Sequence, residues 1–164
     1  MTPTAPDRTR DGFALVGWVV LALAAGGVGS VLQGGDVAGR YLALERPGWA
    51  PPSWAFGVVW PVLYVLIGVA AWRVWRRARD GRAALVPLGL WGLQLVLNAV
   101  WPWVFFGQEA FTAAIGIIVV LDAVVLATLV AMARVDRVAA WLLAPYLAWL
   151  GYATALNIAV AQAN

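Results

Sequence analysis

The chain has 164 residues, of which 63% are hydrophobic and only 12% are charged, and its mean hydropathy is +0.83. A water-soluble domain carries about 25% charged residues, so this composition excludes a soluble globule and indicates a protein embedded in a lipid bilayer. The chain also has no cysteine and no histidine, which excludes disulfide bonds, Cys or His metal sites, and Ser-His-Asp or Cys-His catalysis.

Residues 1–11 are polar, which predicts a disordered N-terminal tail. The first apolar run, residues 12–33, is longer than the apolar region of about 7–15 residues in a signal peptide, so we interpret it as a retained membrane span. Small residues recur at every fourth position: Ala22, Gly26, Ser30 and Gly34. This pattern allows helices to approach closely in lipid, and packing within the bundle is preferred over a dimer seam.

Residues 34–52 form a long loop, which is interrupted by three prolines near its end. Proline lacks a backbone donor and restricts the preceding residue, so no helix is expected before Ser53, which is a predicted N-cap. Four further apolar runs follow at 53–75, 83–106, 109–133 and 137–161. Each has the ~20 residues needed to cross a bilayer. We predict an all-α membrane protein in which residues 12–164 form one bundle of five transmembrane helices, with the loop between the first two helices capping a pocket.

The eleven basic residues are all arginines, and they lie mainly between the apolar runs. They are therefore interpreted as topology signals and not as a nucleic-acid site, so no nucleic-acid partner is expected. Nine of them fall in the tail and in the second-to-third and fourth-to-fifth connections, and only Arg40 and Arg46 fall in the long loop. The positive-inside rule then predicts a cytoplasmic N-terminus and an extracytoplasmic loop and C-terminus.

One face of the third run carries Gln94, Asn98, Trp101 and Phe105 at helical spacing. A carboxamide in a membrane span is costly unless it is hydrogen-bonded, so this face is predicted to point into the bundle. Bonding between helices is the preferred role for Gln94. For Asn98, bonding between helices and ligand contact remain open alternatives.

The fifth run has a similar face with Tyr146, Trp149, Ala153 and Asn157. Small neighbours leave room beside Trp149 for a flat ligand, and simple packing of aromatic rings is the alternative. Asp122 is the one acid deep in a span. It has no second titratable partner for a proton relay, so a hydrogen bond to Asn98, Gln94, Asn157 or a tyrosine is preferred.

The sequence contains no carboxylate pair, metal cluster, phosphate-binding loop or nucleophile–base set, so no metal and no conventional catalytic residue is predicted. An aromatic, weakly polar cavity under a proline-rich loop predicts a flat and mostly apolar ligand. These residues alone do not identify that ligand.

Four stretches resemble one family: RPGWAPPSW, VVWPVLY, VPLGLWGLQLVLNAVWPWVFFG and PYLAWLGYATALN, between residues 46 and 157. They are similar to the TspO/MBR family, the tryptophan-rich sensory proteins related to the mitochondrial translocator protein. The resemblance implies a five-helix bundle, often a homodimer, that binds porphyrins such as protoporphyrin IX and acts in tetrapyrrole transport or in stress- or oxygen-linked regulation. It also implies a multi-pass protein of a bacterial inner or plasma membrane.

The resemblance further implies which residues line the pocket, and it favours ligand contact for Asn98 and Trp149. The implied residues are Tyr41, Trp60, Tyr64, Asn98, Trp101, Phe105, Phe106, Trp149, Ala153 and Leu156. With no histidine or cysteine, a porphyrin would be held by shape and stacking, with no covalent cofactor.

Three features depart from the family pattern. Arg40-Tyr41 stands where the family often has Trp-Tyr, and the acid of the fourth run is Asp122 instead of one near Ile117. The mammalian sterol motif is missing from residues 158–164, so cholesterol binding is not expected. Two alternative functions remain: light- and oxygen-dependent porphyrin degradation using Trp60 and Trp149, and regulation through a protein partner.

Overall fold

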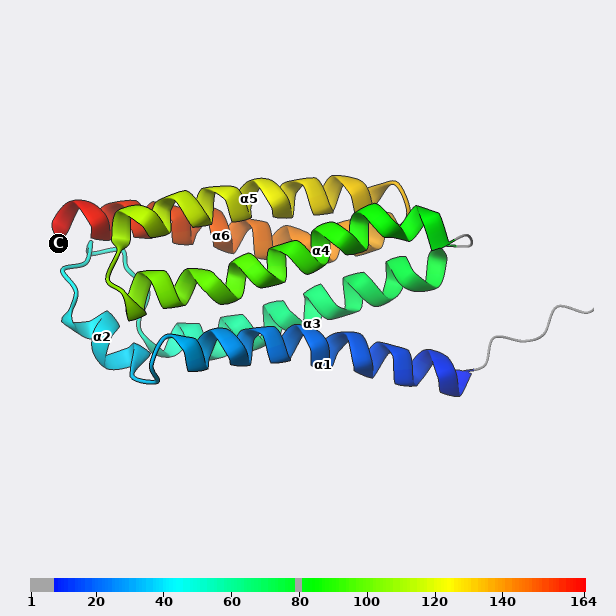
Figure 1. Cartoon of the computed structure of the whole chain (residues 1–164), viewed down its shortest axis with the longest axis horizontal. Coiled ribbons are helices and arrows are strands. Elements are labelled where there is room, and N and C mark those ends of the chain that lie inside the picture. Colours follow the sequence, from blue (N-terminus) through cyan, green and yellow to red (C-terminus); the bar gives the residue numbers. More distant parts are fainter. Residues whose placement is uncertain (1–7, 79–80) are drawn as a thin grey trace, which may run out of the picture.

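Five long helices lie side by side in the computed structural model, which describes residues 8–78 and 81–164 (Figure 1). They are α1 (Arg8–Leu32), α3 (Trp54–Arg77), α4 (Gly81–Pro102), α5 (Phe111–Ala133) and α6 (Arg137–Ala163), joined by a short helix α2 (Val37–Ala43) and a π-helical turn η1 (Trp103–Gly107). The long helices are each long and apolar enough to cross a membrane. The predicted all-α architecture with five membrane spans is confirmed, and the described residues contain no strand.

The packing order places α1 against α3 and α4, α5 against α4 and α6, and α3 against α6. Large apolar side chains are exposed along the outside of the bundle, for example Val31 at 78% and Leu85 at 67%. A water-soluble monomer rarely exposes so much contiguous apolar surface, whereas a bilayer accommodates it. The chain is therefore an integral membrane protein that crosses the bilayer several times.

The first helix begins earlier than predicted. Arg8 to Asp11 are helical, so the predicted tail was too long at its C-terminal end; residues 1–7 lie outside the described residues. Asp11 contributes to the early start, because its backbone carbonyl accepts a hydrogen bond from Trp72 Nε1 at 3.2 Å and its carboxylate lies 3.7 Å from Arg76 Nη1. These contacts attach the start of α1 to α3.

Small residues bring α1 close to its neighbours, as predicted. Ala22 is fully buried, and a Cβ added to Gly26 would overlap the ring of Tyr64 on α3. Two of the four residues of the small-residue pattern, Ala22 and Gly26, therefore pack inside the bundle. Ser30, one turn further along, lines a cavity.

The loop between α1 and α3 contains a helix that the sequence analysis did not predict. Gly34 and Gly35 have positive φ angles of 89° and 84°, which turn the chain away from α1. Asp36 then caps α2 by accepting a hydrogen bond from the Gly39 backbone N–H at 2.9 Å. Ser53 stands at the predicted N-cap position of α3, but its side chain makes no capping hydrogen bond.

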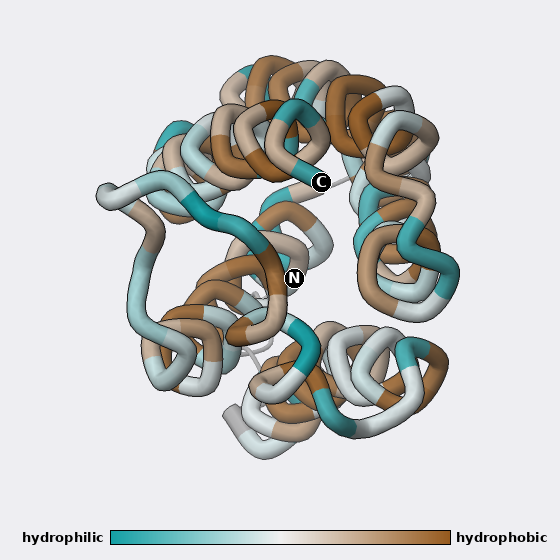
Figure 2. The backbone as a smooth tube through the Cα atoms, turned by 90° about the vertical axis from the view of Figure 1, so that its left-hand side faces the viewer, coloured by the Kyte–Doolittle hydropathy of each residue, from teal (hydrophilic) through white to brown (hydrophobic). Residues whose placement is uncertain are grey.

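This loop lies across one end of the bundle, where the C-terminus also ends (Figure 2). Three contacts attach it there. The side chain of Asn164 makes two hydrogen bonds of 3.1 Å with the backbone N–H and carbonyl of Glu45. Tyr152 donates to the carbonyl of Trp49 at 3.0 Å, and Arg40 donates to the carbonyl of Phe106. The loop is thus held over η1 and the end of α6 by bonds to residues distant in the sequence.

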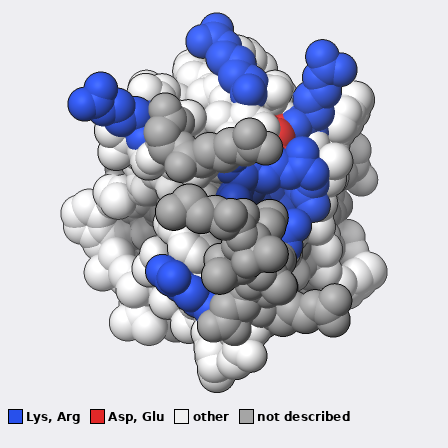
Figure 3. Space-filling model, turned by 90° about the vertical axis from the view of Figure 1, so that its right-hand side faces the viewer, with Lys and Arg blue, Asp and Glu red and all other residues white. Residues whose placement is uncertain are grey.

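The opposite end of the bundle carries a cluster of arginines (Figure 3). Asp136 anchors part of this cluster: its carboxylate caps α6 through the backbone N–H groups of Val138 and Ala139, and it lies 2.9 Å from Arg73 and 3.2 Å from Arg77. The connection between α5 and α6 is therefore attached to the end of α3 by charge-assisted bonds.

Candidate ligand-binding cavity

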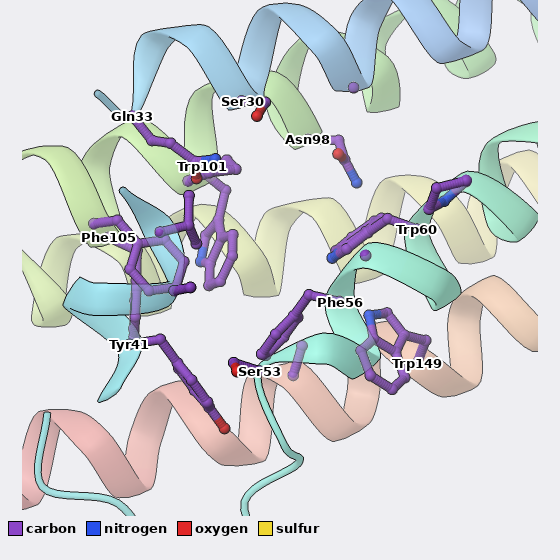
Figure 4. A pocket seen from close by; sticks show the side chains of 18 of the residues that line it. Ser30, Gln33, Tyr41, Ser53, Phe56, Trp60, Asn98, Trp101, Phe105 and Trp149 are labelled. Carbon is purple, nitrogen blue, oxygen red and sulfur yellow. The ribbon is translucent and has the colours of Figure 1, made fainter. Parts of the chain in front are cut away.

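A cavity of about 450 Å³ lies between the helices at the end covered by α2. Its volume falls in the range of roughly 300–1,000 Å³ that is typical of small-molecule sites. Side chains from α1, α2, α3, α4, η1 and α6 form the wall, and most of them are apolar or aromatic (Figure 4). The cavity is thus suited to a ligand with a large apolar surface.

All ten residues that the sequence analysis assigned to a pocket lie on this wall. They are Tyr41, Trp60, Tyr64, Asn98, Trp101, Phe105, Phe106, Trp149, Ala153 and Leu156. The fold brings them together from five elements, and their contact with a ligand remains a prediction.

Several wall residues were not predicted. Those on or just after α1 are Leu23, Gly26, Gly27, Ser30 and Gln33, and others include Val37, Ala38, Ser53, Phe56, Gly57, Pro61, Pro102, Asn157 and Val160. Phe56 stands one helical turn before Trp60 and two before Tyr64, so helical spacing is a signal that predicts it. On α1, Gly26 and Ser30 belong to the small-residue pattern, which predicted close helix packing and not a place in the cavity wall.

A buried hydrogen-bond network joins three helices beside the cavity. Tyr64 on α3 donates to Asn98 Oδ1, and Asn98 Nδ2 donates to the hydroxyl of Tyr146 on α6 at 2.7 Å. Tyr146 donates in turn to Gln94 Oε1 at 2.9 Å. The predicted bonding of Gln94 between helices is confirmed. Asn98 has the same role and also reaches the cavity wall, so the two alternatives for it do not exclude each other.

A second polar contact fixes an aromatic ring in the wall. Trp101 Nε1 donates to Asn157 Oδ1 at 3.1 Å, and Asn157 Nδ2 donates to the carbonyl of Phe111 at the same distance. Trp101 also stacks on Phe105, with ring centroids 5.0 Å apart and planes inclined by 25°. The orientation of the Trp101 ring is therefore determined by contacts with α6 and η1, and Asn157 is itself held by α5.

Aromatic rings lie on two sides of the cavity. Trp101 and Phe105 form one side, and Phe56 and Trp60 lie across from them, with Asn98 between (Figure 4). Rings in such an arrangement offer faces and edges to a planar apolar molecule. The geometry therefore favours a flat ligand over a compact one.

Trp149 adds a polar group to this aromatic wall. Its ring packs edge-on against Phe56 with centroids 6.1 Å apart, and its buried Nε1 has no hydrogen-bond partner among the described residues. A buried donor without a partner is costly, so this N–H is an unsatisfied polar group beside the cavity.

Asp122 lies away from the cavity wall and has a partner that was not predicted. Its Oδ2 accepts a hydrogen bond of 2.7 Å from Thr154 on α6, so the predicted bond to Asn98, Gln94, Asn157 or a tyrosine was wrong. Thr154 follows the wall residue Ala153 and points to the α5 side. Asp122 therefore joins α5 to α6. Among the described residues, no three acidic side chains lie close enough together to bind a metal ion.

Comparison with known proteins gives consistent matches over nearly the whole chain. The family model described as TspO/MBR family matches residues 18–162. The Translocator protein of Homo sapiens is 40% identical over 138 residues, covering 84% of this chain and 82% of the relative. The Tryptophan-rich protein TspO of Chlorobaculum tepidum is 35% identical, covering 88% and 91%, and Protein CrtK of Rhodobacter capsulatus is 33% identical, covering 90% of each.

Proposed function

The chain belongs to the TspO/MBR family, and from this premise we propose that it binds porphyrins of the protoporphyrin IX type in the cavity under α2. The observation that carries the proposal is that aromatic rings line two facing sides of the cavity, with Asn98 between them. A planar macrocycle can lie between such rings. Protoporphyrin IX contains no iron and so needs no axial ligand, which agrees with a chain that has no histidine or cysteine, and the ring is held by stacking and shape.

The cellular role that we propose is tetrapyrrole transport or stress- and oxygen-linked regulation. Relatives carry the names Translocator protein and Tryptophan-rich sensory protein, which correspond to these two roles. No pair of ion-coupling residues and no inverted repeat is evident in the sequence, which disfavours active transport. Regulation through a protein partner and the homodimer remain predictions.

We also propose that the cavity opens toward the extracytoplasmic side. Among the described arginines, Arg40 and Arg46 belong to the loop over the cavity, and the others lie at or near the opposite end. The positive-inside rule assigns the arginine-rich end to the cytoplasm. The N-terminus is then cytoplasmic and the C-terminus extracytoplasmic.

A titration in the dark with protoporphyrin IX tests porphyrin binding, because three of the eleven tryptophans lie on the cavity wall and their fluorescence should be quenched. We expect saturable quenching in the wild type. Asn98→Leu removes a polar group from between the aromatic sides of the wall and leaves Tyr64 without its acceptor, so the affinity is expected to fall about tenfold, which corresponds to about 1.4 kcal/mol.

Gln94→Leu is the matched control, because Gln94 belongs to the same network but does not reach the cavity. It should leave the affinity within about twofold of the wild type. Equal losses in both variants would assign the effect to the network as a whole. Quenching that does not saturate in the wild type would contradict the proposed function.

Light-dependent porphyrin degradation is a second candidate function. The observation that favours it is a series of redox-capable rings beside the cavity: Trp60 stacks on Tyr64 at 5.7 Å and lies 6.3 Å from Tyr146, and Trp149 has an unpartnered N–H. Under light and oxygen, bound porphyrin should lose absorbance, and Trp149→Phe should slow that loss by more than it weakens binding in the dark. An unchanged rate in Trp149→Phe would remove Trp149 from this role.

A further inference from the structure

Arg40 and Arg46 differ from the other arginines in their surroundings. The three ion pairs found among the described residues all involve arginines of α3 at the other end of the bundle. Within residues 8–78 and 81–164, neither Arg40 nor Arg46 has a carboxylate within 4 Å. Two positive charges therefore stand beside the cavity without a paired anion.

Direct contacts attach both side chains to residues of the cavity wall. Arg40 donates through Nη1 to the carbonyl of Phe106, which lines the cavity. The guanidinium carbon of Arg46 lies 4.5 Å from the centre of the Tyr41 ring, another wall residue. Tyr41 is itself fixed, because its hydroxyl donates to the carbonyl of Pro51 at 2.7 Å. The two guanidinium groups are thus positioned where the loop meets the cavity.

These contacts leave most of the donors on the two arginines available. A guanidinium has five N–H donors, and its flat fork matches a carboxylate. Arg40 uses one nitrogen for the carbonyl of Phe106, and Arg46 makes a long hydrogen bond of 3.4 Å from Nε to the carbonyl of Leu44. Both side chains are half-buried, so solvent screens them less than fully exposed arginines.

We propose that Arg40 and Arg46 form a carboxylate-binding rim, which selects flat apolar ligands that carry carboxylates at their edge. This inference rests on the proposed porphyrin site and adds its selectivity. The apolar body of such a ligand lies between the aromatic rings, and its acidic edge faces the loop. Neutral ligands of the same shape enter the same cavity but lack the charge-assisted bonds.

The test compares protoporphyrin IX with its dimethyl ester, which keeps the macrocycle and removes both charges. Each is titrated in the dark into the wild type and into Arg40→Gln/Arg46→Gln. We expect the wild type to bind the acid at least about tenfold tighter than the ester. The double variant should bind both compounds with the affinity that the wild type has for the ester. Arg134→Gln/Arg137→Gln, with two exposed arginines at the opposite end, should keep the wild-type preference.

Other outcomes separate this inference from the proposed function. If the wild type binds acid and ester equally, porphyrin binding stands and the rim is contradicted. If the double variant still prefers the acid, the arginines do not bind the carboxylates. If its affinity for the ester falls as well, the arginines act by holding the loop in place. If neither compound binds to the wild type, the proposed function itself fails.

Discussion

Replacing Ala153 by phenylalanine is expected to weaken protoporphyrin IX binding at least about a hundredfold, or by about 2.7 kcal/mol. Ala153 lies on the cavity wall in the helix that also carries Trp149 and Leu156. A benzyl group at this position enters the space that a planar ligand needs. Because the cavity holds only about 450 Å³, it does not accommodate both rings without moving a helix.

The measurement is the same fluorescence titration, with Ala155→Phe as the matched control. Ala155 is exposed on the outer surface of the same helix, so its variant adds the same ring toward lipid. Ala155→Phe should bind like the wild type. Retention of wild-type affinity by Ala153→Phe would exclude this cavity as the porphyrin site.

Replacing Gly68 by alanine is expected to destabilise the bundle by about 1–3 kcal/mol, although alanine favours a helix more than glycine does. Gly68 is buried where α3 meets α1, and an added Cβ would lie 2.6 Å from the Cα of Val19 and 3.0 Å from the carbonyl oxygen of Trp18. These are backbone atoms, so a side-chain rotation does not relieve the overlap and the helices must separate.

Gly116→Ala on α5 is the control, because a Cβ there would have no neighbour within 4 Å. Its stability should be unchanged or slightly raised. Unfolding by sodium dodecyl sulfate in mixed micelles, followed by helical circular dichroism, gives both free energies. Equal stability of the two alanine variants would contradict the close contact between α1 and α3.

The fold could be predicted from the sequence because the membrane imposes a simple rule on apolar runs. Each run of sufficient length forms a helix, since a backbone without internal hydrogen bonds is excluded from lipid. Short elements outside the bilayer do not follow this rule. The seven-residue helix α2 depends on one Asp36 cap and on contacts to distant residues, and neither produces hydrophobic periodicity.

The candidate site could be predicted in part for a similar reason. Asn98 and Trp101 share one face of α4, and Trp149 and Ala153 share one face of α6, so spacing and the family resemblance assigned them together. Contacts between residues on different helices are harder to predict from the sequence. Spacing within α5 identifies Asp122 as unusual but contains no information on Thr154, its partner on another helix.

A structure of the protein with protoporphyrin IX bound in lipid or detergent tests the central claim most directly. We expect the macrocycle between the aromatic sides of the cavity, in contact with Asn98 and Trp149 and with its carboxylates toward Arg40 and Arg46. A macrocycle on the lipid-facing surface, with the cavity empty under conditions where binding saturates, would contradict the account.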